Sequence, residues 1–299
     1  MASEVADAAP VVERAKRTPF WRTSTFRRLI RHRSFMIGLV LFLIVLFVAV
    51  FAGWLAPSDP NRLAIRNRFK PPQADFLFGT DNLGRNMLSR VVYGAQLSLY
   101  IGAWVVVLNA VFGVILGAAS GYFRRLDGML MGLADALMAF PPILLAIGIA
   151  AALGPSVYTA VIALSIVYIP RTGRIVRASV LVVREMEFVQ AAQAAGASNW
   201  RILRRHIMPN CMAPLIVQLS FIFAFAVLTE AILSFLGLGA PPTTPTWGIL
   251  IAEGRTYIRE AWWICLIPGL AIAITVLGLN LLGDGLRDVL DPRLKIEQG

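Results

Sequence analysis

The chain has 299 residues, of which 58% are hydrophobic and 15% are charged, and its mean hydropathy is +0.70. This composition is too apolar for an ordinary soluble domain and predicts an integral membrane protein. The net charge of +11 is also typical of nucleic-acid-binding proteins. Here, however, the arginines stand between apolar stretches and form no face with interleaved aromatic residues, so we expect no nucleic acid partner.

The N-terminal region predicts a cytosolic tail followed by a membrane helix. Residues 1–34 end in a segment, near Phe20 and again near Arg28, in which aromatic and basic side chains are mixed. This mixture is typical of an interfacial helix on an anionic inner leaflet. Residues 35–56 then carry no charge and are long enough to cross a hydrocarbon core, which needs roughly 20 residues. The run is about twice as long as the apolar region of a signal peptide, so we expect a retained first transmembrane helix.

The later apolar runs predict five more crossings. Residues 57–94 are the expected extracytoplasmic loop before the second span. The run 129–169 is too long for one crossing and is cut by Gly154-Pro155-Ser156, which predicts two antiparallel spans with a tight turn. The other spans are expected at about 97–119, 210–236 and 262–282. We therefore predict an all-α protein with six transmembrane helices.

The positions of Lys and Arg predict the orientation of these helices. With the N-terminus inside, the inner segments hold 20 of the 28 Lys and Arg residues. Six of the remaining eight lie in one outer loop, between Arg62 and Arg90, which we expect to fold as a small external element. Both termini are therefore expected to be cytosolic.

Residue types that would support catalysis are scarce. None of the three lysines, Lys16, Lys70 and Lys295, follows a glycine, so the chain has no Walker-type phosphate loop for ATP. Both histidines, His32 and His206, lie in predicted cytosolic segments, which disfavours an intramembrane proton relay, metal site or hydrolase. We expect a non-catalytic chain with no metal and no cofactor of its own.

Four residues at membrane depth are candidates for a translocation pathway or a subunit interface. Glu230 is the clearest, because a charged residue at the bilayer centre costs roughly 2.5–3.5 kcal/mol on insertion scales. Its carboxyl group either packs against another subunit, which we favour, or lines the pathway. Asp135, about two turns into the third span, is expected to be interfacial. Pro141 and Pro142 remove two backbone donors, so the span must kink or break there, and we favour a kink.

The cytosolic loop 186–209 has the most informative pattern. Its first half, 188–195, is rich in Ala and Gln, which are strong helix formers. Gly196 suits the end of that helix and Ser198 suits the N-cap of a second one. A short helix with small side chains is a narrow rod that fits a groove on another protein. The pattern therefore predicts a helix-turn-helix docking element.

This loop resembles the EAA loop of ABC importer permeases, which has the form EAA, three residues, Gly, nine residues, then I-x-L-P. The matching positions are Gln190, Ala191, Ala192, Gly196, His206, Met208 and Pro209, with Trp200 and Arg201 between them. Three residues depart from the pattern: Gln190 replaces Glu, His206 replaces Ile and Met208 replaces Leu. The first change removes a possible ionic contact and leaves a side chain that can form hydrogen bonds.

Motifs outside the loop extend the resemblance over about residues 20–293. They include FGTDNLGR at 78–85, LSFLGLG at 233–239 and NLLGDGLRD at 280–288, and they are most similar to the C-type permease of dipeptide and oligopeptide importers. Asn86 stands where this family often has an acid. The resemblance implies a type I ABC importer transmembrane fold, with a module at 95–285 that contains spans two to six and a cytosolic tail at 286–299.

The resemblance also implies the partners. They are a homologous B-type permease, two ABC ATPase subunits that hold ATP and Mg, an extracytoplasmic binding protein, a peptide and the lipid of a bacterial inner membrane. Thr80, Asp81 and Arg85 in the external loop are the expected contacts for the binding protein. The same machinery could carry nickel or glutathione. A secondary transporter driven by an ion gradient is less favoured, because the spans hold few ionisable residues and show no evident inverted repeat.

Overall fold

A computed structural model gives the fold of the chain and describes residues 24–290. Within this range the chain is helical, with two isolated β-bridges and no strand. The α-helices are α1 (Ser24–Arg31), α2 (Arg33–Val50), α3 (Ala52–Leu55), α4 (Met87–Leu108), α5 (Val114–Tyr122), α6 (Arg124–Met138), α7 (Pro142–Leu153), α8 (Val157–Arg184), α9 (Glu187–Ala194), α10 (Asn199–Ile202), α11 (Met212–Phe235), α12 (Trp247–Gly254) and α13 (Trp263–Leu290). Of the predicted tails at 1–34 and 286–299, residues 1–23 and 291–299 lie outside the described residues.

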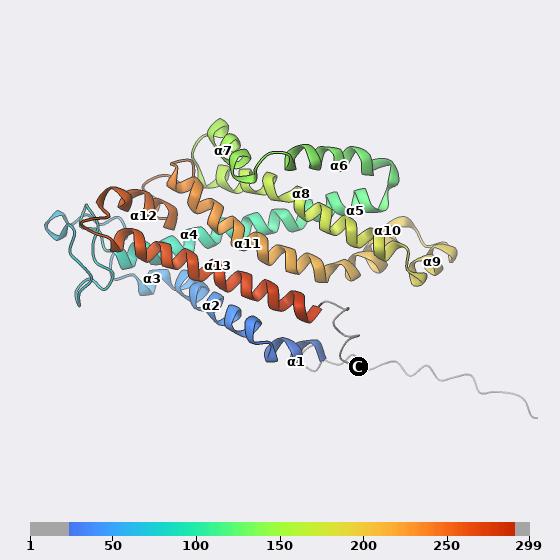
Figure 1. The fold of residues 1–299 in the computed structure, drawn as a ribbon, viewed down its shortest axis with the longest axis horizontal. Coiled ribbons are helices and arrows are strands. Elements are labelled where there is room, and N and C mark those ends of the chain that lie inside the picture. The colour runs from blue at the N-terminus through green and yellow to red at the C-terminus, as the bar shows by residue number, and fades with distance from the viewer. Residues whose placement is uncertain (1–23, 291–299) are drawn as a thin grey trace, which may run out of the picture.

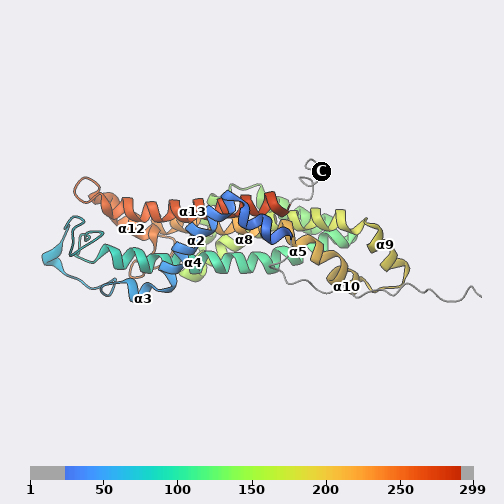
Figure 2. The same ribbon diagram turned by 90° about the horizontal axis from the view of Figure 1, so that it is seen from below.

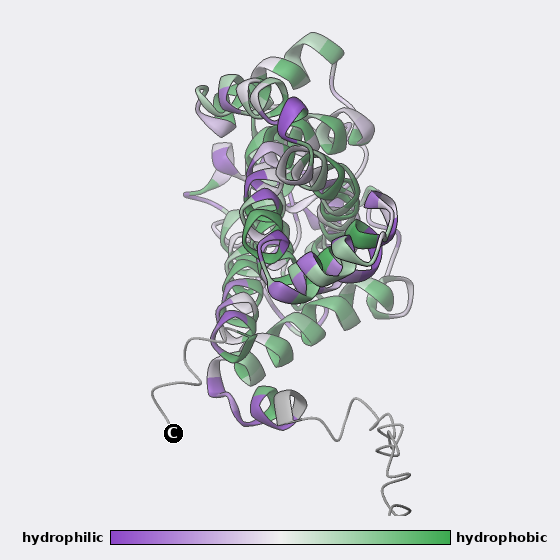
Figure 3. Cartoon of the chain, turned by 90° about the vertical axis from the view of Figure 1, so that its right-hand side faces the viewer, coloured by the Kyte–Doolittle hydropathy of each residue, from purple (hydrophilic) through white to green (hydrophobic). Residues whose placement is uncertain are grey.

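The helices form an elongated bundle with two different ends (Figure 1). The long helices run roughly along the long axis in both views, while the loop 57–86 and α12 occupy one end and α9 and α10 the other (Figures 1 and 2). Figure 3 looks onto the end with α9 and shows hydrophilic residues on the short segments there and hydrophobic residues along the long helices. This distribution suits a protein whose sides face lipid and whose ends face water.

The membrane spans agree with the predicted fold class. Five helical stretches are long and apolar enough to cross a bilayer: Arg33–Val50, Met87–Tyr122, Val157–Arg184, Asn199–Phe235 and Trp263–Leu290. A sixth crossing requires α6 and α7 together. The all-α membrane fold is thus confirmed, with five continuous candidate spans and a sixth if the bent pair α6–α7 crosses the membrane as one span.

The predicted third span is broken rather than kinked. Helices α6 and α7 meet at 90°, which is larger than the proline kink that the sequence favoured. Pro141 has φ −55° and ψ 128°, outside the helical region, because a following proline disfavours helical geometry. Pro142 then starts α7, a position where its missing donor is not needed. The break therefore follows from the two consecutive prolines.

The second span begins ten residues before its expected start. Asn86 occupies the N-cap of α4, and its side chain accepts a hydrogen bond from the backbone N–H of Ser89 at 3.2 Å. The predicted external loop, 57–94, accordingly ends at residue 86. Within the first turns of the helix, the charge of Arg90 is paired with Asp81 and Glu253.

Two pairs of long helices, α2–α13 and α5–α8, are in close backbone contact at glycine residues. A Cβ on Gly38 of α2 would lie 2.6 Å from the carbonyl oxygen of Gly278 in α13, and one on Gly117 of α5 would lie 2.5 Å from that of Gly173 in α8. Only glycine allows helices to approach so closely. The pair α5–α8 extends to the end of the molecule that carries α9, so it supports the loop described next.

Candidate functional site

The predicted docking loop folds as a helix, a glycine turn and a second short helix. After α9, Gly196 adopts φ +77°, a left-handed conformation. Its backbone N–H bonds to the carbonyl of Gln193 at 2.9 Å, and that of Ala197 bonds to the carbonyl of Ala192 at 3.0 Å. These two bonds form a Schellman motif. The predicted role of Gly196 at the helix end is confirmed, and it depends on backbone conformation, since a Cβ there would meet no atom within 4 Å.

Helix α9 is attached on one face and exposed on the other. Val189 is its one fully buried side chain, and it packs in a cluster with residues of α8 and α10, among them Val183 and Ile202. Gln190 and Ala191 are exposed. The Gln190 amide donates to the carbonyl of Glu185 at 3.2 Å. The exposed side of the helix combines the small residues Ala191 and Ala194 with the longer side chains of Glu187, Phe188, Gln190 and Gln193.

The second half of the loop returns the chain to the bundle. Ser198 stands at the N-cap of α10, but its side chain makes no capping bond. Trp200 is 69% exposed, and Arg201 and Pro209 are exposed as well. His206 is half-buried, with its ring 6.4 Å from that of Phe188. The predicted loop residues are therefore mostly at the surface.

Hydrogen bonds connect this loop to two long helices. The Tyr122 hydroxyl at the end of α5 donates to the Asn199 side chain at 2.9 Å. Arg184 at the end of α8 donates to the carbonyl of Gly121 at 3.0 Å and pairs with Glu185 at 3.0 Å. A force on α10 would therefore reach α5 through the Tyr122–Asn199 bond, and the Arg184–Gly121 bond joins α5 to α8.

Glu230 lies inside the chain. Its side chain is completely buried in α11 and accepts hydrogen bonds from Ser234 at 2.6 Å and from Ser98 of α4 at 3.1 Å. The structure places it between two helices of the same chain, so neither a contact with another subunit nor a place on the pathway is seen. Ser98 is 132 positions away, which is why the sequence did not reveal it.

Asp135 and the two prolines lie on the exposed side of α6 and α7. Asp135 accepts a hydrogen bond from Arg174 of α8. Asp127, in the first turn of α6 and farther from the break, accepts two hydrogen bonds of 2.6 Å from Arg177. Pro141 and Pro142 are exposed. These ion pairs hold α6 against the half of α8 nearest to α9.

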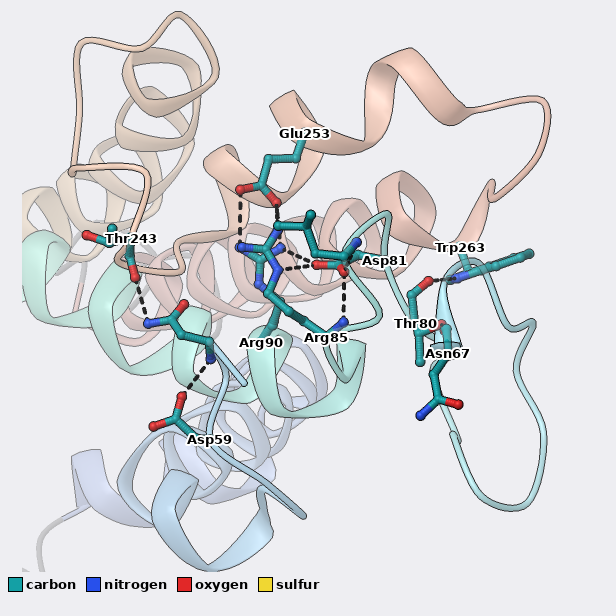
Figure 4. Close-up of polar contacts among 11 residues, drawn as sticks. Asp59, Asn67, Thr80, Asp81, Arg85, Arg90, Thr243, Glu253 and Trp263 are labelled. Carbon is teal, nitrogen blue, oxygen red and sulfur yellow. Dashed lines mark hydrogen bonds and ion pairs between the residues drawn. The ribbon is translucent and has the colours of Figure 1, made fainter. Parts of the chain in front are cut away.

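The three residues predicted to contact a binding protein are buried. Thr80 and Asp81 are completely buried and Arg85 is 7% exposed. Thr80 donates to the carbonyl of Asn67, accepts from the backbone N–H of Lys70 at 2.9 Å, and its own carbonyl accepts from Trp263 at 3.0 Å (Figure 4). In this structure they hold the external loop in place and offer no surface, which corrects the prediction.

Asp81 and Arg85 belong to a four-membered ion cluster that sequence reasoning missed. Asp81 accepts from Arg85 at 2.5 Å and from Arg90 at 2.9 Å, while Glu253 of α12 accepts from the same two arginines at 2.7 and 2.5 Å (Figure 4). Two carboxylates balance two guanidinium groups, and Arg90 is completely buried. The available signal was Glu253, a single acid within an apolar stretch of α12.

The surface of the external loop is formed by other side chains. Leu63, Ile65 and Leu77 are 60%, 63% and 64% exposed. Within residues 24–290, no three His, Cys, Asp or Glu side chains are arranged to hold a metal ion. The exposed surface of the loop 57–86 therefore mixes these apolar side chains with the charged residues Arg62, Arg66, Arg68 and Asp75.

A solved structure has a fold similar to that of this chain. It is similar to a chain from the structure described as inward-facing conformations of the MetNI methionine ABC transporter, with a TM-score of 0.56 and 18% sequence identity over 68% of this chain and 97% of that chain. At this identity the likeness concerns the fold, which is that of a type I ABC importer permease.

Sequence comparisons agree. Residues 109–296 match the family model described as binding-protein-dependent transport system inner membrane component, and residues 19–72 match the N-terminal transmembrane domain of oligopeptide transport permease C. A Brucella abortus protein named as a peptide transport system permease is 60% identical, covering 91% of this chain and 92% of its own length. The dipeptide transport system permease protein DppC of Escherichia coli K12 is 46% identical, covering 89% and 91%. The chain therefore belongs to the family of binding-protein-dependent transport system inner membrane components.

Proposed function

We propose that the chain is one of two permease subunits of an ATP-driven importer and that it carries di- or oligopeptides across the bacterial inner membrane. The relatives at 43–60% identity that support this cargo are named for peptide or dipeptide transport. Family membership sets the ion-driven alternative aside, and no observation favours nickel or glutathione. The N- and C-termini are placed in the cytosol, on the side of α9.

The observation that carries the proposal is the construction of α9. An eight-residue helix with one buried side chain, two exposed alanines and a Schellman cap has the shape of a rod that seats in a groove of an ATPase subunit. In this proposal ATP and Mg are held by two such subunits, and this chain takes no part in hydrolysis. Their closure moves α9 and α10, the Asn199–Tyr122 bond passes the movement to α5, and the Arg184–Gly121 bond couples α5 to α8.

At the opposite end, the external loop would meet a substrate-binding protein. The ion cluster of Asp81, Arg85, Arg90 and Glu253 fixes the loop on α4 and α12. Because the loop is already rigid, a loaded binding protein can bind to it without the free-energy cost of ordering the loop. In this proposal the exposed side chains of Leu63, Ile65 and Leu77 contact the binding protein. They take the place of Thr80, Asp81 and Arg85, which are buried.

The experiment is a comparison of two Ala→Trp variants in the co-purified complex. Ala191→Trp adds a large side chain to the exposed face of α9, so the chain should fold while the ATPase subunits are lost or bound much more weakly. Ala74→Trp adds the same side chain to an exposed position of the external loop and should retain the ATPases. Equal retention of ATPase in both variants would contradict the role of α9.

A further inference from the structure

A basic cavity of about 600 Å³ lies beside the docking loop. It is formed where α5, α6 and α8 meet the loop. Its lining residues are Tyr122, Phe123, Arg124, Arg125, Leu126, Arg184, Gln193 and Asn199. Gln193 and Asn199 belong to the docking loop itself, so the cavity is continuous with the surface of α9.

The charges in this cavity are of one sign. Three arginines line it and no carboxylate does. Arg184 is paired with Glu185 at 3.0 Å, whereas Arg124 and Arg125 are exposed and have no ion-pair partner among residues 24–290. Asp127, the nearest acid along the chain, makes both of its bonds with Arg177. The cavity therefore holds two uncompensated positive charges.

The apolar part of the cavity indicates what kind of partner fits. Phe123 and Leu126 are 41% and 39% exposed, next to the free arginines. Arginine together with aromatic side chains is enriched where proteins bind one another. Tyr122 is bonded to Asn199 at 2.9 Å, which keeps the cavity and the docking loop in a fixed relation. A single partner could therefore contact both.

We propose that this cavity is a second docking site for the ATPase subunit, and that it receives an acidic segment of that subunit. This inference rests on the proposed function, and it adds a partner chemistry to it. The free arginines would set the register of the ATPase on α9 and speed its association, as complementary charges do. The partner would then hold the α5–α6 turn and α9 together, so both would move with it.

Site-specific photo-crosslinking in the assembled complex tests the location. A benzophenone amino acid at Phe123 should crosslink to the ATPase subunit. The same probe at Gln190 reports on the proposed function, and at Leu77 in the external loop it should not reach the ATPase. A crosslink from Gln190 but none from Phe123, or one from Phe123 to lipid alone, would overturn the second site and leave the first intact. No ATPase crosslink from either position would overturn both.

Charge reversal tests the chemistry. Arg124→Glu with Arg125→Glu should weaken binding of the purified ATPase subunits about tenfold and reduce the salt dependence of that binding. The control is Arg27→Glu with Arg28→Glu in α1, which makes the same change in net charge at exposed residues on the same proposed side. An equal effect of the two pairs of substitutions, or no effect of the first, would contradict a specific acidic contact.

Discussion

The two ends of the molecule are built in opposite ways. At the external end, the loop 57–86 is fixed by a buried ion cluster and by the Trp263 bond to Thr80. At the other end, α9 is attached through one buried valine and a few hydrogen bonds. The difference indicates that the loop 57–86 is held rigidly by buried contacts, whereas α9 is held by few contacts.

The largest expected effect concerns the platform. Arg90→Met leaves Asp81 and Glu253 with one guanidinium instead of two, and removing one partner of a buried ion pair typically costs about 3–5 kcal/mol. We expect a clear fall in the thermal unfolding temperature of the purified complex. Adding Glu253→Gln restores charge balance and should recover part of the loss. An unchanged unfolding temperature for Arg90→Met would show that the cluster does not hold the loop.

A much smaller effect is expected for the ion pair that holds α6. The side chains of Asp135 and Arg174 are about half exposed, and exposed pairs contribute about 0–1 kcal/mol. A double-mutant cycle with Asp135→Asn and Arg174→Gln, followed by unfolding in low and high salt, measures this coupling. A coupling free energy as large as the effect of Arg90→Met would contradict the difference in rigidity between the two ends.

The sequence predicted the features that depend on local patterns. Apolar runs located the spans, and the spacing around Gly196 predicted the turn of the docking loop. The prolines at 141 and 142 predicted a disturbance, although a 90° break depends on how α6 and α7 pack. These features need few distant residues, so the chain itself specifies them.

The sequence did not predict the features that depend on distant contacts. Arg90 and Glu253 are 163 positions apart, and Glu230 and Ser98 are 132 apart. The sequence showed neither set of partners, so Arg90 was assigned to the external loop, and Glu230 was expected either to pack against another subunit or to line the pathway. The motif that contains Thr80, Asp81 and Arg85 was correctly singled out, but its burial follows from α12 and α13 folding over it.

The central claim is that α9 must keep its geometry to couple the permease to ATP hydrolysis. The direct measurement is ATP hydrolysis by the complex in lipid nanodiscs, with binding protein and peptide, for Gly196→Asn and Gly196→Val. Asparagine accepts the left-handed conformation at this position, whereas a β-branched residue does not, and a Cβ added here meets no atom within 4 Å. We predict that Gly196→Asn retains peptide-stimulated hydrolysis and that Gly196→Val falls to the peptide-free rate. Full stimulation in Gly196→Val would contradict the account.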